Sequence, residues 1–102
     1  MNIEQERVGK SKVVLTLNGR LDTVNAPLLE RKIKEQEGIT ELELDFKEVS
    51  YISSMGLRVL LQAKKAMKAD GVSMSIKNMQ DSVREIFEMT GFLNLMAQEE
   101  KA

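Results

Sequence analysis

Segments with strand-like and helix-like spacing of apolar residues alternate along this chain. Residues 41–46 place an apolar side chain at every second position, which is typical of a strand with a buried face. Residues 54–69 instead repeat apolar side chains at intervals of three and four, as an amphipathic helix does. Residues 72–76 return to alternation. Because strands separated by helices are joined by right-handed crossovers, this order predicts a largely parallel sheet.

Two more strands are expected before these segments. Residues 2–8 alternate weakly, and residues 12–17 form a β-branched, mostly apolar run that suits a central strand. We expect this second strand to end at Asn18-Gly19, which has the composition of a turn.

Two more helices are also expected. The first is capped by Asp22 or Thr23 and stopped by Gly38, and another covers residues 81–90 and is stopped by Gly91. No linker-like or repetitive stretch separates the segments. The sequence therefore predicts one α/β domain over residues 1–102.

Composition excludes several classes of function. The chain has no cysteine and no histidine, so it lacks the commonest metal ligands and the commonest general base. A net charge of −1 does not suit a nucleic-acid-binding protein, which usually has a basic surplus. No apolar run approaches the ~20 residues that span a bilayer, and the N-terminus is too polar for a signal peptide. We expect a cytoplasmic protein that binds neither nucleic acid nor membrane.

The step from residues 41–46 into the following helix carries two adjacent hydroxyl groups, Ser53 and Ser54, before Met55 and Gly56. Backbone N–H groups are unpaired at a helix start, and the helix dipole favours negative charge there. A serine in this place can be a plain N-cap, and it can also carry a phosphoryl group. The residues alone leave both interpretations open.

A projection of the second helix at about 100° per residue separates its two sides. The expected buried side holds Gly56, Val59, Leu60, Ala63 and Met67. The expected exposed side holds Ser54, Arg58, Leu61, Lys65 and Lys68. Leu57 lies at the boundary. Arg58, Lys65 and Lys68 have the character of an ordinary solvated face. Alternatively, Ser54, Leu57, Arg58 and Leu61 form one docking patch for a partner, with a modifiable hydroxyl at its edge.

Three groups of residues resemble the sequence signature of STAS domains. The first group is Leu17-Asn-Gly-Arg-Leu-Asp22 with Ala26 and Leu29. The second is Leu44-Asp-Phe46, Val49, Tyr51-Ile-Ser-Ser-Met-Gly-Leu57 and Leu60-Leu61. The third is Val83-Arg-Glu-Ile-Phe87 with Thr90-Gly91. The resemblance implies a mixed, mostly parallel sheet of four to five strands flanked by about four helices.

The small single-domain members of this family are bacterial anti-sigma factor antagonists, so the resemblance also implies a partner-switching cycle. The unmodified domain would bind an anti-sigma factor that is a serine kinase, and so release a sigma factor. Phosphorylation by that kinase would end binding, and a metal-dependent serine phosphatase would restore it.

The resemblance places the phosphorylated residue at Ser54. Many antagonists have aspartate where this chain has Ser53, which makes Ser53 an alternative acceptor. Asp22 matches an acidic residue near the family's phosphorylation site, although it can equally be a helix cap. The expected partner-binding residues are Asp22, Thr23, Ser53, Met55, Gly56, Leu57, Arg58 and Leu61.

Two other functions compete with this one. An enzyme would have to use Asp22 with Ser53 and Ser54, but a serine nucleophile needs a base, and the chain has neither histidine nor a phosphate-binding glycine loop. We therefore expect no catalysis, no cofactor and no metal. A STAS scaffold in a signalling assembly, or a subunit associated with a transporter, is the second alternative.

Overall fold

A four-stranded sheet forms the centre of the structure, a computed structural model that describes residues 1–94. The strands are β1 (Asn2–Val8), β2 (Lys12–Leu21), β3 (Glu41–Ile52) and β4 (Ser73–Lys77), and they lie in that order across the sheet. β1 runs antiparallel to β2, whereas β2, β3 and β4 are parallel. The predicted mixed, mostly parallel sheet is confirmed.

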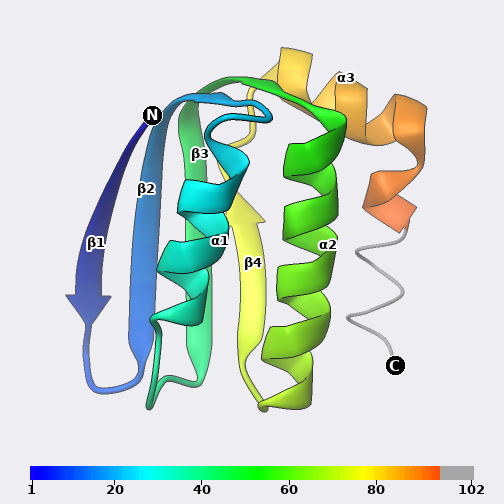
Figure 1. The fold of residues 1–102 in the computed structure, drawn as a ribbon. Coiled ribbons are helices and arrows are strands. Elements are labelled where there is room, and N and C mark those ends of the chain that lie inside the picture. The colour runs from blue at the N-terminus through cyan, green and yellow to red at the C-terminus, as the bar shows by residue number, and fades with distance from the viewer. Residues whose placement is uncertain (95–102) are drawn as a thin grey trace.

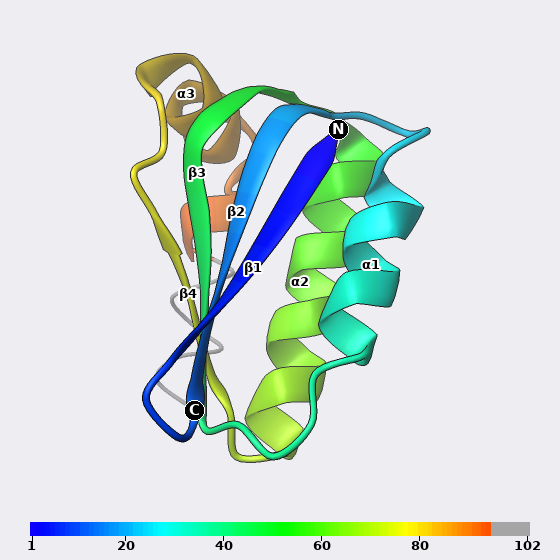
Figure 2. The same ribbon diagram turned by 90° about the vertical axis from the view of Figure 1, so that its left-hand side faces the viewer.

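Two helices cover one face of this sheet, as Figure 2 shows from the side. They are α1 (Ala26–Lys34) and α2 (Ser54–Ala69), which also contact each other. A third helix, α3 (Asp81–Thr90), lies beyond the end of β4 and against β3 (Figure 1). Residues 92–94 are helical again at the limit of the described residues. The bounds of α2 and α3 agree with the prediction, and Gly91 ends α3 with a φ of 74°.

The core lies between the sheet and the two helices. Alternate residues of β2 and β3 point into it and are fully buried; they are Val13, Leu15, Leu17, Leu42, Leu44 and Phe46. They meet the apolar sides of α1 and α2, which contribute Leu29, Ile33, Val59 and Leu60. Removing each such side chain from water favours folding by about 1.5–3 kcal/mol. This layer therefore holds α1 and α2 against the strands.

The predicted end of the second strand is wrong. β2 continues past Asn18-Gly19 to Leu21, with two shifts of register against β3 along the way. Gly19 has a φ of 123°, which suits such an irregularity inside a strand. β3 likewise runs on to Ile52, which pairs with Leu21. The two central strands therefore end side by side.

The start of α1 also differs from the prediction. Asn25, rather than Asp22 or Thr23, is its N-cap residue, and Asn25 makes no side-chain cap hydrogen bond. β4 begins and ends one residue later than expected, a difference within the usual uncertainty of element ends.

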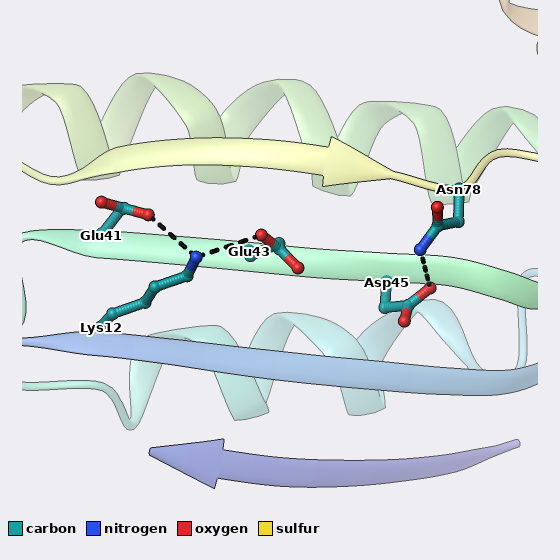
Figure 3. A network of polar contacts seen from close by, with 5 residues as sticks. All are labelled: Lys12, Glu41, Glu43, Asp45 and Asn78. Carbon is teal, nitrogen blue, oxygen red and sulfur yellow. Dashed lines mark hydrogen bonds and ion pairs between the residues drawn. The ribbon is translucent and has the colours of Figure 1, made fainter. Parts of the chain in front are cut away.

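The face of the sheet away from α1 and α2 is polar. Lys12 of β2 lies between two carboxylates of β3, with Nζ 3.3 Å from Glu41 Oε2 and 3.3 Å from Glu43 Oε1 (Figure 3). Further along, Asn78 Nδ2 donates to Asp45 Oδ1 at 3.2 Å. Hydrogen bonds to Glu41 and Glu43 raise the pKa of Lys12 above its usual value.

No helix among residues 1–94 is long and apolar enough to cross a bilayer.

Candidate functional site

The loops that follow β2 and β3 meet at one edge of the sheet. The backbone N–H of Ser53 donates to the carbonyl oxygen of Leu21 at 3.0 Å. Gly56, in the first turn of α2, packs against the same place, since a Cβ there would lie 2.8 Å from Leu21 O and 2.9 Å from Ile52 Cγ1. The start of α2 therefore rests directly on the end of β2.

Ser53 is the N-cap of α2. Its backbone is extended, with φ −93° and ψ 171°, and its Oγ accepts a hydrogen bond from the Gly56 N–H at 3.2 Å. Its carbonyl oxygen accepts from the Leu57 N–H at 3.0 Å, the first bond of the helix. The side chain is half-buried and already serves the helix.

Ser54 differs from its neighbour in each of these respects. It is the first residue of α2 and is exposed, as the helical projection predicted. Within residues 1–94, its hydroxyl makes no hydrogen bond. Of the two hydroxyls in the step, Ser54 is thus the one that an external enzyme can reach without breaking the helix cap.

Asp22 shapes the loop between β2 and α1. Its Oδ1 accepts a hydrogen bond from the Asn25 N–H at 2.9 Å, and Asn25 Nδ2 in turn donates to the Arg20 carbonyl oxygen at 2.9 Å. These two bonds fix the loop and leave Thr23 and Val24 exposed at its tip. Asp22 therefore orders the loop that leads into α1 without being part of that helix. This loop adjoins the Ser53 loop through Leu21.

The expected partner-binding residues are only partly on the surface. Met55 is 37% exposed, and Arg58 is also exposed. Gly56 is buried and Leu57 is only 3% exposed, so these two hold α2 in place and offer no side-chain surface. Leu61, which the projection placed on the exposed side, is half-buried and packs against the core.

The same edge carries exposed residues that the sequence analysis did not select. Val24 is 80% exposed, an unusual environment for a β-branched apolar side chain on an ordered loop. The Arg20 guanidinium lies 4.3 Å from the centre of the Tyr51 ring, and Tyr51 is itself 36% exposed. The signal for Val24 was its place between the polar residues Thr23 and Asn25, in the loop that follows β2.

Two observations limit the chemistry of this edge. Residues 1–94 contain no group of three or more acidic side chains placed to hold a metal ion. Lys64 of α2 is 5% exposed, and its Nζ donates to the Met74 carbonyl oxygen at 2.6 Å, on the side of α2 toward β4. The edge offers a reachable hydroxyl, apolar side chains and an arginine, which suit binding and modification by another protein.

The fold and this edge define a class, namely small α/β domains whose central parallel strands present an exposed serine at the start of a helix. The STAS domain family model matches residues 2–102 of this chain. The chain belongs to the STAS domain family.

Two curated relatives place the chain within that family. BtrV of Bordetella bronchiseptica is 33% identical over 85 residues, which cover 81% of this chain and 73% of BtrV. The anti-sigma-B factor antagonist of Bacillus subtilis is 28% identical over 98 residues, which cover 94% of this chain and 90% of that protein.

Solved structures share the fold. The anti-sigma factor antagonist SpoIIAA in its unphosphorylated form has a TM-score of 0.70 and 23% identity, over 85% of this chain and 82% of that one. A sulfate transporter family protein from Wolinella succinogenes has a TM-score of 0.79 and 17% identity, over 92% and 78%. At these identities the likeness concerns the fold alone.

Proposed function

We propose that this protein is an anti-sigma factor antagonist. In its unmodified form it binds an anti-sigma factor that is an ATP-using serine kinase, and so releases a sigma factor. The kinase phosphorylates Ser54, which ends binding, and a metal-dependent serine phosphatase restores the unmodified form. The observation that carries the proposal is the exposed hydroxyl of Ser54 beside the capping hydroxyl of Ser53.

The fold tolerates a phosphoryl group at Ser54. A phosphoserine carries a charge of about −1.5 to −2 at pH 7. The start of α2 has unpaired N–H groups, a positive dipole end and no acidic residue in its first turn. The modification therefore leaves the free energy of unfolding nearly unchanged, and its effect is confined to the interface.

A partner surface that fits the unmodified edge does not tolerate the same group. Val24 and Met55 give the edge an apolar character, so closure over Ser54 removes water from the hydroxyl. Burying an unpaired dianion costs several kcal/mol, and each ~1.4 kcal/mol is tenfold in affinity. We expect phosphorylation to weaken binding about 100-fold or more.

The test begins with capture of the kinase. The protein with Ser54→Ala is used as bait in an extract of the native cell, and the captured proteins are identified by mass spectrometry. The captured kinase is then purified, and its affinity for the unmodified protein, for Ser54→Asp and for Ser53→Asp is measured by titration calorimetry. Ser53→Asp is the matched control, because it adds the same charge while keeping a capping side chain.

The proposal predicts a kinase among the captured proteins and a selective loss of affinity with Ser54→Asp. Capture of a membrane transport complex in place of a kinase would overturn the proposal in favour of a transporter-associated subunit. Equal affinity of the kinase for Ser54→Asp and for the unmodified protein would overturn the switch.

A further inference from the structure

α2, the helix that begins at Ser54, is strongly basic, whereas the protein as a whole is not. The 16 residues of α2 include Arg58, Lys64, Lys65 and Lys68 and no acidic residue. The whole chain has a net charge of −1. The acidic residues therefore lie elsewhere in the chain, and six of them are on β1 and β3.

Strand geometry places five of these six acidic residues on the far side of the sheet. Glu41, Glu43 and Asp45 alternate with buried residues of β3 and so point away from the helices (Figure 3). Glu4 and Glu6 of β1 pair with half-buried residues of β2 that face the same way. Lys12 and Lys77 lie on the same face, so its acidic excess is partly neutralised, and the outer side of α2 lies on the other side of the molecule (Figure 2).

Three cations of α2 have no counter-ion within the described residues. Arg58, Lys65 and Lys68 are exposed, and none forms an ion pair with any of residues 1–94. In contrast, the α1 residues Lys32 and Lys34 pair with acidic residues of their own helix. An unpaired cation on a solvated helix is common, but three together on one face, with no ion-pair partner among residues 1–94, create a directional field.

These cations are arranged in line. Ser54, Arg58, Leu61, Lys65 and Lys68 are spaced by four, three, four and three residues. At about 100° per residue, they lie within an arc of about 80°. With a rise of 1.5 Å per residue, the line extends about 21 Å. We call these five residues the α2 stripe; Leu61, which is half-buried and packs against the core, lies at its centre with cations on both sides.

We propose that the α2 stripe is the docking surface for an acidic segment of the anti-sigma factor. The inference rests on the proposed function and extends it from the Ser54 edge along the whole outer side of α2. Charge complementarity identifies the occupant: the three cations lack acidic partners among residues 1–94, and a net charge of −1 does not suit the binding of a polyanion such as nucleic acid.

The stripe also explains how one modification at its end acts on the whole surface. A phosphoryl group on Ser54 adds about −1.5 to −2 to a line whose three cations carry +3. It lies one turn before Arg58, the i, i+4 spacing at which side chains on a helix meet. Phosphorylation therefore gives Arg58 an internal counter-ion and repels the acidic segment at the same time.

Charge reversal with a matched control tests the proposal. The captured kinase is the probe, and association rate constants are measured by stopped flow at about 50 mM and at several higher salt concentrations. The test variant is Lys65→Glu/Lys68→Glu. The control variant is Lys10→Glu/Lys77→Glu, which makes the same change in net charge at exposed positions outside α2. Circular dichroism of both variants checks that they are folded.

We expect the test variant to associate at least about tenfold more slowly at low salt, with a flatter salt dependence, and the control to differ less than about twofold. Equal rates for the two variants, or binding of duplex DNA by the unmodified protein that is lost in the test variant, would overturn the inference. If Ser54→Asp still releases the kinase in that case, the proposed function stands and the stripe alone is rejected. If no kinase is captured, both fail.

Discussion

The backbone N–H of Ser53 donates to the carbonyl oxygen of Leu21 across 3.0 Å, and this bond joins the two loops of the Ser54 edge. Leu21 and Ile52 are the last residues of β2 and β3 and are paired in the sheet. Because both loops leave from one pair of strand ends, Asp22 and Ser54 occupy the same edge although they are 32 positions apart in the sequence.

Gly56→Ala should destabilise the protein. At an open helical position this change stabilises by about 1 kcal/mol, because alanine is the better helix former. At Gly56 the added Cβ meets Leu21 O at 2.8 Å, and the overpacking should cost about 1–3 kcal/mol. Urea unfolding measures the change, and its sign is decisive: an increase in stability would mean that α2 does not rest on Leu21.

Ser53→Ala and Ser54→Ala should separate the helix-capping role of Ser53 from the proposed phosphorylation switch at Ser54. Ser53→Ala removes the acceptor for the Gly56 N–H and should lower the free energy of unfolding by about 1 kcal/mol. Ser54→Ala should leave it nearly unchanged, since its hydroxyl has no partner within residues 1–94. Chemical denaturation of both variants tests this, and a larger loss with Ser54→Ala would reverse the two roles.

Lys64→Met should destabilise far more than Lys65→Met. Methionine keeps an apolar stem of similar length but cannot donate to the Met74 carbonyl oxygen, which Lys64 Nζ contacts at 2.6 Å. Leaving a buried acceptor unsatisfied costs about 1–3 kcal/mol, whereas Lys65 is exposed. Thermal melting compares the two variants, and equal melting temperatures would exclude a structural role for Lys64.

Part of this arrangement could be predicted from the sequence. The spacing of apolar residues defined α2, and its start and end residues gave the correct bounds because they act locally. The predicted strand end at Asn18-Gly19 was wrong, because the local turn preference of these residues is overridden by pairing with β3. Helical spacing likewise does not distinguish Lys64 from Lys65, because the burial of Lys64 depends on β4, a strand that begins nine residues later.

The candidate site, like the fold, could be predicted from the sequence only in part. The exposure of Ser54 followed from helical geometry alone. The exposure of Val24 did not, because two side-chain hydrogen bonds, from Asp22 and Asn25, set the shape of its loop. Leu61 was placed outside by the same projection that placed Ser54 correctly, since a projection does not include the neighbouring elements that cover a side chain.

The ion pairs of Lys12 should appear in the dependence of stability on pH. Hydrogen bonds to Glu41 and Glu43 raise the Lys12 pKa above the usual 10.5, so folding favours the charged form. This stabilisation is fully present below pH 10.5 and is lost as the pH rises through the higher pKa of the folded state.

Lys12→Gln measures that contribution. The difference in unfolding free energy between the unmodified protein and this variant should be constant at neutral pH and shrink above pH 10.5. High salt should also reduce it, because the pairs are partly exposed. A difference that grows with pH would contradict the assignment.

The most direct measurement of the central claim is the position of the phosphoryl group. The unmodified protein, Ser53→Ala and Ser54→Ala are each incubated with the captured kinase and ATP, and the modified residue is located by mass spectrometry. We expect one phosphoryl group on Ser54 in the unmodified protein and in Ser53→Ala, and none in Ser54→Ala. Modification of Ser53, or of neither serine, would contradict it.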